Sequence, residues 1–340
     1  REVIRANRAD GRAYSFVRQA DGLIVGDPDV AEKLVFVPGA TSADDRWQYT
    51  TTTDEVEFYE VGALDAVGKL LAIRSREGHE TQLGYDAQGR LQSVTGPFGG
   101  RVLKYTYKDT ANRVATITVP GGAVYQYSYD SKGNLEQVTY PDNKTRRYHY
   151  EDSRFPNHLT GITDERGIRY ITWQYDSEGR GILSEGPGGI NRHTLVFGAN
   201  KRVTVTDALN QTRQYDFRFL HSRHKLAAVT GGGCPTCGDA ASYTYDANGY
   251  LASKTDHNGV QTRYVYNSRG LQESRTEAVG TPIERTITTT WDATYQLPLL
   301  ETYPEKSLSY AYQGALLQQT TITDLATNTN RKTTYTWNNN

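Results

Sequence analysis

Aromatic positions alternate with polar ones in short stretches of this chain, and the same stretch returns many times. From Ser242 to Thr255 the sequence is SYTYDANGYLASKT, with a Tyr-x-Tyr pair, an aspartate, a glycine and a second alternating run. Residues two apart lie on one face of a β-strand, so each Tyr-x-Tyr pair predicts a strand with an aromatic face. Similar stretches are GYDAQGRLQSVTGPFG, YSYDSKGNLEQVTYPDN, WQYDSEGRGILSEGPGG and YVYNSRGLQESRTEAVG.

The aromatic residue that opens each block recurs at intervals of 18 to 30 residues, most of them between 21 and 25. These residues are Tyr85, Tyr107, Tyr129, Tyr150, Tyr175, Phe197, Tyr215, Tyr245, Tyr266, Trp291, Tyr312 and Trp337. A repeat of this length indicates units that bury their apolar faces only by packing on their neighbours. The intervals of 18 and 30 residues on either side of Tyr215 indicate a shifted boundary and an insertion.

Turn chemistry follows each aromatic residue. An aspartate at the first turn position can accept a hydrogen bond from the N–H two residues later, and a glycine three residues after it can adopt the left-handed conformation. The predicted turn-forming residues are Asp86, Gly89, Asp130, Gly133, Asp176, Gly179, Asp246, Gly249 and Gly270, and Asp216 and Asp292 also follow an aromatic residue. A type I turn followed by such a glycine joins two strands through a three-residue loop with a bulge. Outgoing strands are predicted at 91–94, 135–140 and 251–255, each followed by a second turn.

Composition supports an all-β fold. Tyr (25 residues) and Gly (32 residues) are abundant, and Tyr suits half-buried pleated surfaces. One short segment could form a single helical turn, with Asp27 as its cap and Pro28 at its first position. The fold class expected is therefore all-β, built from tandem hairpins.

Charge and hydropathy exclude several partners. The chain has 38 basic and 39 acidic residues, so it offers no electrostatic footprint for nucleic acid. Apolar runs such as LVFV at 34–37 are far too short to span a membrane. The chain has no methionine and starts with an arginine, so we expect an internal or processed piece, whose start lacks a signal sequence but leaves export open.

The blocks resemble the YD repeats of bacterial rearrangement-hotspot (Rhs) proteins, of the C components of insecticidal toxin complexes and of animal teneurins. The resemblance covers Tyr59 to the end, and RADGRAYSF at 8–16 resembles the degenerate opening of an Rhs core. It divides the chain into a degenerate N-terminal β region, 1–58, and a YD-repeat array, 59–340, which we expect to be cut within its last repeat at YTWNNN.

The resemblance also implies an architecture and a function. The sheet would spiral into a hollow β-shell whose partners are the rest of the shell and an enclosed C-terminal toxin domain. Such a protein would be secreted or delivered at the cell surface in interbacterial competition. We expect this segment to lack the family's glycine-rich core-terminating motif with its autoproteolytic aspartates, and to carry no toxin domain of its own. We therefore expect a structural segment and no enzyme.

Candidate catalytic chemistry is weak. The repeated aspartates could be paired carboxylates for acid–base catalysis, but their fixed place beside a turn glycine favours turn capping. The histidines have no partner serine or cysteine at a recognisable spacing, so no catalytic residue and no cofactor are expected.

One stretch, HSRHKLAAVTGGGCPTCGD, carries residue types found in zinc sites. His221, His224, Cys234 and Cys237 could bind zinc, although residues three apart on a strand face opposite sides. Cys234 and Cys237 could instead form a small disulfide loop or remain two free thiols, and these alternatives stay open. Asn143 and Asn210 lie in glycosylation sequons but fall where the second turn needs an asparagine.

The aromatic stripe leaves a second function open. It could bind carbohydrate or an unfolded client by stacking, or it could be the packed or lumen-facing wall of the sheet. The alternative to the shell is therefore a surface adhesion or carbohydrate-binding repeat protein. Because an open sheet has unpaired strand edges, the chain is also expected to self-associate.

Overall fold

The computed structural model describes residues 2–62, 67–231 and 240–337. These residues contain no α-helix; their helical elements are three single-turn 3₁₀ helices, η1 (Ser42–Asp44), η2 (Pro187–Gly189) and η3 (Ala199–Lys201). All other regular elements are β-strands. The predicted all-β fold of tandem hairpins is confirmed.

The chain forms two compact units. The first contains Arg1–Glu80, Arg218–Ala228 and Cys234–Asn340, and the second contains Thr81–Phe217 and Val229–Gly233. The division into an N-terminal region (1–58) and a repeat array (59–340) concerns the repeat pattern and stays a proposal.

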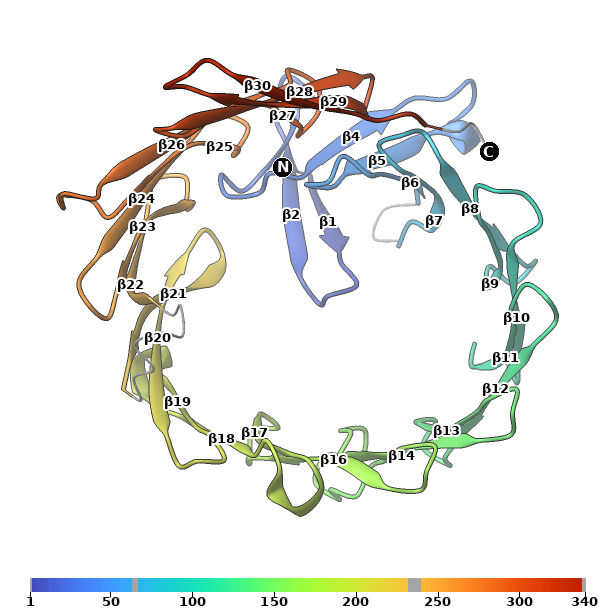
Figure 1. Cartoon of the computed structure of the whole chain (residues 1–340). Helices are drawn as coiled ribbons and strands as arrows, with labels where there is room; N and C mark the ends of the chain where they lie inside the picture. The colour runs from blue at the N-terminus through green and yellow to red at the C-terminus, as the bar shows by residue number, and fades with distance from the viewer. Residues whose placement is uncertain (1, 63–66, 232–239, 338–340) are drawn as a thin grey trace. The chain divides into compact units, whose positions relative to one another are not determined.

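The second unit is an antiparallel meander in which each strand pairs with the next in sequence order (Figure 1, teal through green to yellow). Its strands are β8 (Glu80–Tyr85), β9 (Leu91–Thr95), β10 (Val102–Tyr107), β11 (Val114–Thr118), β12 (Val124–Tyr129), β13 (Leu135–Thr139), β14 (Thr145–His149), β15 (Gly161–Thr163), β16 (Arg169–Tyr175), β17 (Gly181–Glu185), β18 (His193–Phe197), β19 (Val203–Thr206) and β20 (Thr212–Leu220). Alternation of the side chains places the Tyr-x-Tyr pairs on one face of this sheet.

A β-bulge precedes the block-opening aromatic residue in several hairpins of this unit. Gly84 pairs with Ser93, but the next residue, Tyr85, pairs with Leu91, so the outgoing strand holds one extra residue there. The same shift lies directly before Tyr107, Tyr129 and Tyr175. Bulges increase local twist and re-aim side chains, so these four hairpins turn their aromatic residues in the same way.

The first unit combines the beginning of the chain with its last third. Strands β1 (Val3–Asn7), β2 (Ala13–Arg18) and β3 (Ile24–Gly26) form a separate small sheet, and β4 (Lys33–Val37), β5 (Arg46–Thr50), β6 (Val56–Glu60) and β7 (Leu70–Arg74) pair in order. The remaining strands, also paired in order, are β21 (Arg223–Thr230), β22 (Ala240–Tyr245), β23 (Leu251–Asp256), β24 (Gln261–Tyr266), β25 (Gln272–Glu277), β26 (Arg285–Trp291), β27 (Pro298–Thr302), β28 (Lys306–Gln313), β29 (Leu316–Asp324) and β30 (Asn330–Thr334).

The small sheet packs on β4 to β6 around the best-buried apolar cluster. Tyr14, Phe16, Leu34 and Tyr49 form this cluster, and the rings of Phe16 and Tyr49 meet edge to face with centroids 6.2 Å apart. Both Phe16 and Tyr49 are 1% exposed, so removing either ring would leave a cavity. The N-terminal 60 residues therefore hold a true core, whereas most repeat side chains are only half-buried.

The segment at Asp27 and Pro28 forms a single hydrogen-bonded turn, as expected, but no helix begins there. The N–H of Val30 donates to the carbonyl of Asp27 at 2.9 Å, which closes one turn, and the chain then continues to β4. Val30 packs against the core cluster and Leu34 lies inside it, and an extended chain delivers both side chains to that core.

Candidate functional site

The repeated loop after each aromatic residue is the chemically distinctive element of the chain, and we call it a corner. In residues 86–90, the Asp86 N–H donates to the carbonyl of Arg90 at 2.9 Å and the Gly89 N–H donates to the carbonyl of Asp86 at 2.8 Å. Asp86 Oδ1 accepts from the N–H groups of Gln88 at 3.0 Å and Arg90 at 2.9 Å. The bond from the Arg90 N–H is the main reason that the pKa of Asp86 is lowered. Gly89, with φ of +76°, adopts the left-handed conformation without a steric cost.

Other predicted turn residues have the same arrangement. In each, a side-chain oxygen of the first residue accepts from the N–H four residues later, and the fourth residue has φ between +74° and +88°. These pairs are Asp130 with Gly133, Asp176 with Gly179, Asp246 with Gly249 and Asn267 with Gly270. The side-chain bond from the N–H four residues later was not part of the sequence prediction, which considered only the bond from the N–H two residues later.

Second turns at the far ends of the strands use the same chemistry. The Oδ1 atoms of Asp164, Asp207 and Asp256 each accept from the N–H groups two and four residues later. The left-handed residues of these loops are Gly167, Asn210 and Gly259. The sequence analysis expected second turns at Asn210 and after the strand at 251–255, and the structure confirms both. The Asp-x-x-Gly or Asp-x-x-Asn spacing is the signal for the capping bonds of these turns.

Asp216 differs from the other aspartates that follow an aromatic residue. It lies inside β20 and pairs with Arg202, whose Nε is 2.7 Å from its Oδ1. The loop in this part follows Phe197 instead, with the Gly198 N–H donating to the carbonyl of Arg202 at 2.8 Å. The interpretation of Tyr215 as a block-opening residue before a turn is therefore wrong, because Tyr215 lies inside the nine-residue strand β20 and no turn follows it directly.

An arginine after the corner connects one repeat with the next. Arg90 Nε donates to Asp86 Oδ2 at 2.7 Å, and the same guanidinium lies 4.5 Å from the ring centroid of Tyr107. Arg180 repeats this between Asp176 and Phe197, with its guanidinium 4.4 Å from the ring centroid. An ion pair and a cation–π contact therefore share one side chain, which fixes the ring of the following repeat over the preceding corner.

The polar tip of the block-opening aromatic residue makes a second connection. Its hydroxyl or indole N–H donates to a backbone carbonyl 15 to 20 residues earlier, near the start of the preceding outgoing strand. The donor–acceptor pairs are Tyr107–Leu91, Tyr129–Val114, Tyr175–Leu159, Tyr245–Leu226, Trp291–Gln272 and Trp337–Leu317, with distances between 2.6 and 2.9 Å. We call this bond the aromatic tie. Sequence reasoning missed it, although the restriction of most of these positions to Tyr and Trp, which can both donate, is a signal for it.

Two acidic residues of the N-terminal region contact corners of the first unit. The Asp29 side chain, only 1% exposed, pairs with Lys225, whose Nζ also donates to the carbonyl of Gly249 at 2.8 Å. Asp54 Oδ2 accepts from the N–H of Gln296 at 2.7 Å, within the loop that follows Trp291. These contacts join segments 196 and 242 residues apart in sequence.

The two histidines of the possible zinc set have separate partners. His221 Nε2 lies 3.0 Å from the carbonyl oxygen of Ala247, and the His224 ring packs on Phe219 with centroids 5.2 Å apart. Cys234 and Cys237 lie outside the described residues, so zinc, disulfide and free thiols remain alternatives for them. In the part of the chain that is described, no group of three or more His, Cys, Asp or Glu side chains could hold a metal ion.

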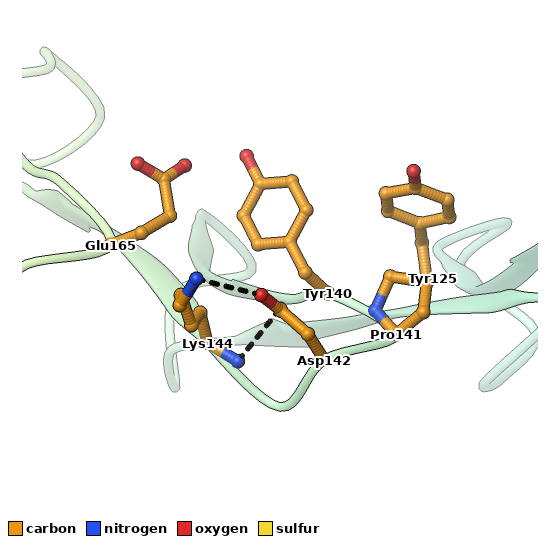
Figure 2. Close-up of a pocket in the computed structure, with 6 residues that line it drawn as sticks. All are labelled: Tyr125, Tyr140, Pro141, Asp142, Lys144 and Glu165. Carbon is orange, nitrogen blue, oxygen red and sulfur yellow. Dashed lines mark hydrogen bonds and ion pairs between the residues drawn. The ribbon is translucent and has the colours of Figure 1, made fainter.

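A shallow hollow of about 420 Å³ lies on the second unit (Figure 2). Its lining residues are Tyr125, Tyr140, Pro141, Asp142, Lys144 and Glu165. The described residues include no helix that is long and apolar enough to cross a membrane.

The hairpin array, its corners and the aromatic ties define a β-repeat protein of the YD type. The chain belongs to the YD-shell family, because the family model described as Teneurin YD-shell matches residues 61–230, which are 170 of the 340 residues. A model described as RHS Repeat matches residues 245–282. The resemblance to YD-repeat Rhs proteins is confirmed.

Individual relatives are longer than this chain. It is 28% identical over 224 residues to the probable deoxyribonuclease RhsB of Dickeya dadantii, which is 60% of this chain and 15% of that protein. It is 34% identical over 110 residues to the toxin protein Tse5 of Pseudomonas aeruginosa, which is 32% of this chain and 8% of that protein. The chain thus spans less than a sixth of the length of these curated relatives. Among solved structures, the TcdB2–TccC3–Cdc42 complex matches with 13% identity and a TM-score of 0.42, over 96% of this chain and 17% of the other.

Proposed function

We propose that this chain is a wall segment of an Rhs-type shell that encloses and delivers a C-terminal toxin domain. Its partners are then the rest of the shell and the enclosed domain, and its role is structural and not catalytic. The relatives named as a toxin and as a probable deoxyribonuclease are consistent with this role, because the chain matches only a small part of each.

The observation that carries the proposal is the tie between consecutive repeats. The aromatic ties use a backbone carbonyl of the preceding hairpin, and at Tyr107 an arginine of that hairpin also contacts the ring, so a repeat with such a tie is held by the repeat before it. This arrangement suits a long continuous wall, since a sheet assembled from nearest-neighbour contacts can extend through many units. The wall is proposed to act outside the producing cell, either secreted or delivered by contact in interbacterial competition.

Protease protection of the full-length protein that carries this chain tests the proposal. With an epitope tag on the C-terminal domain, the tagged domain should resist trypsin as long as the wall is folded, and should become cleavable at the urea concentration that unfolds the wall. Gly249→Ala should lower that urea concentration more than the matched variant Gly259→Ala. A tagged domain that is cleaved equally fast below and above the unfolding transition would contradict enclosure.

A further inference from the structure

Exposed apolar side chains of the second unit gather at one rim of its sheet. Because the strands are antiparallel and pair in order, all second turns of this unit lie at one rim and all corners at the other. Five large apolar side chains of this unit are exposed, and four of them are in second turns: Phe98, Ile168, Ile190 and Leu209. The fifth, Val196, lies in β18. Residues 81–217 are all described, and none of these side chains lies in a corner, so the two rims differ in chemistry.

Three of these side chains form a regular row. Ile168, Ile190 and Leu209 lie in three successive second turns, which join β15 to β16, β17 to β18 and β19 to β20. We call these three side chains the apolar tips. Neighbouring strands are about 4.8 Å apart, so successive second turns are about 10 Å apart and the row is about 20 Å long. The tips are 44%, 63% and 80% exposed, and polar turn residues separate them.

The backbone at the apolar tips is already hydrogen-bonded within each turn. The Ile168 N–H donates to Asp164 Oδ1 at 3.0 Å, and the Ile168 carbonyl accepts from the Asp164 N–H at 2.8 Å. The Leu209 N–H donates to Asp207 Oδ1 at 2.9 Å, and the Ile190 carbonyl accepts from the N–H four residues earlier at 2.7 Å. An unpaired backbone group is expensive to place in an apolar medium. These turns can therefore enter such a medium at a lower cost than an open loop.

Basic side chains accompany the apolar tips. The second turns of this unit, with the residues that open the following strands, contain six basic and four acidic residues, a net charge of +2. They are residues 96–101, 119–124, 140–144, 164–169, 186–192 and 207–213. Arg166 and Arg192 each lie two residues from a tip, and although they pair with Asp164 and Glu185, their side chains are 74% and 52% exposed. An arginine can lie along apolar surface and keep its guanidinium among phosphate oxygens.

We propose that this rim binds the surface of a phospholipid bilayer, with Ile168, Ile190 and Leu209 inserted where the headgroups meet the acyl chains. Burial of the three side chains drives binding, and the arginines contact lipid phosphate. The net charge of the rim is small, so binding should not require anionic lipid. The inference concerns this rim alone and does not depend on the shell role.

A protein partner suits the apolar tips less well than a bilayer. A protein that covers exposed apolar side chains does so with pockets or with a continuous apolar patch that matches them in shape. The tips are single side chains about 10 Å apart, so they offer no continuous patch. Lipid molecules move independently of one another, and each tip can reach acyl chains without a matching surface. The rim also consists of closed turns and offers no strand edge to a peptide.

Binding of the chain to vesicles, measured by flotation in a density gradient, tests the proposal. The probes are vesicles of phosphatidylcholine and vesicles of phosphatidylcholine with about a quarter of phosphatidylglycerol. We expect the chain to bind both, with half-saturation at a lipid concentration in the millimolar range. Ile168→Ser, Ile190→Ser and Leu209→Ser should each lower the partition coefficient about threefold or more, and the triple variant about thirtyfold or more.

Val196→Ser is the matched control. Val196 is 64% exposed in the same unit but lies within β18 and not in a turn, so its substitution should leave the partition coefficient unchanged. Ile190→Trp keeps an apolar tip, so this variant should still bind and should add fluorescence that brominated acyl chains quench. All the substituted side chains are exposed, and circular dichroism checks that the variants are folded.

Three outcomes would overturn the proposal. The first is that the chain binds neither kind of vesicle at about 10 mM lipid; loss of self-association in the triple variant would then assign the tips to a second copy of the chain. The second is that Val196→Ser lowers the partition coefficient as much as Ile190→Ser. The third is that the chain binds only the vesicles with phosphatidylglycerol and the triple variant binds them equally well, which would show adsorption by charge alone.

Discussion

Alanine substitution at two glycines separates backbone strain from packing at a corner. Gly249 and Gly259 have nearly the same φ, +86° and +82°, and both lie in the first unit. A Cβ atom on Gly259 would have no heavy atom within 4 Å. On Gly249 it would lie 2.7 Å from His221 Cδ2 and 3.2 Å from Asp29 Cβ. The two alanine variants therefore have the same backbone strain, and they differ only in the atoms that surround the new Cβ atom.

The expected magnitudes follow from these distances. A left-handed alanine costs about 1–2 kcal/mol, partly offset by the lower entropy of its unfolded chain, so Gly259→Ala should destabilise by about 1 kcal/mol. Gly249→Ala must also displace His221 from the carbonyl of Ala247, a further 0.5–1.5 kcal/mol or so, and press on the buried Asp29. We expect a total of about 2–4 kcal/mol for Gly249→Ala. Asp246→Ala removes the side-chain oxygen that accepts from the Tyr250 N–H at the same corner, and it should lower the free energy of unfolding by only about 0.5–1.5 kcal/mol.

Urea unfolding followed by circular dichroism measures these differences, and both glycines report on the same unit. Combining His221→Ala with Gly249→Ala removes the imidazole that the new Cβ atom would contact. The double variant should therefore recover part of the stability lost in Gly249→Ala, and a double-mutant cycle quantifies the recovery. Equal destabilisation by Gly249→Ala and Gly259→Ala would refute the packing argument. A smaller loss for Gly249→Ala than for Asp246→Ala would refute the geometry of the corner.

Four further outcomes are expected. Tyr129→Phe removes the hydroxyl that donates to Val114 and should lower the free energy of unfolding by about 0.5–1.5 kcal/mol, so unchanged urea unfolding would contradict the aromatic tie. Asp29→Asn removes the charge that faces Lys225, which is 17% exposed, and should cost about 2–4 kcal/mol; a wild-type midpoint would show that the pair adds nothing. The pKa of Asp86 is lowered on folding, so the ionised carboxylate stabilises the folded chain at a pH above its unfolded-state pKa of about 4. This stabilisation is lost as the pH falls through the folded-state pKa. Urea midpoints that do not drop between about pH 6 and pH 3 would contradict this prediction. Self-association should raise the sedimentation coefficient over a roughly hundredfold concentration range, and a constant value would indicate that strand edges are protected.

Local features of the sequence were sufficient to predict the hairpins. A corner is closed within five residues, so the spacing of Asp86 and Gly89 carries most of the information that determines it. The outgoing strands predicted at 91–94, 135–140 and 251–255 correspond to β9, β13 and β23. Tyr215 was misinterpreted because an aromatic residue followed by an aspartate can also lie inside a strand, where Asp216 finds a cross-strand arginine.

Long-range contacts could not be predicted in the same way. The acceptor of each aromatic tie is a backbone carbonyl, which leaves no mark in the sequence. Lys225, which pairs with Asp29, and Gln296, which donates to Asp54, lie about two hundred residues or more away, and nothing in the local pattern distinguishes these two aspartates from other turn residues. The hollow at Tyr125 and Tyr140 depends on strand register, which becomes definite only once the turns have been placed.

The aromatic tie has a consequence for how such a chain can evolve. Because every residue has a carbonyl, the accepting position places no demand on its own side chain, and leucine, valine and glutamine all occur there. A duplicated or recombined repeat therefore brings its own donor and finds a ready acceptor in whichever unit comes before it, without a compensating substitution. Tyrosine and tryptophan can replace each other in this role, whereas Phe197 has no polar hydrogen to offer. The aromatic tie does not depend on the side chains of the preceding repeat, so arrays of different length can be produced by unequal crossing-over and still fold.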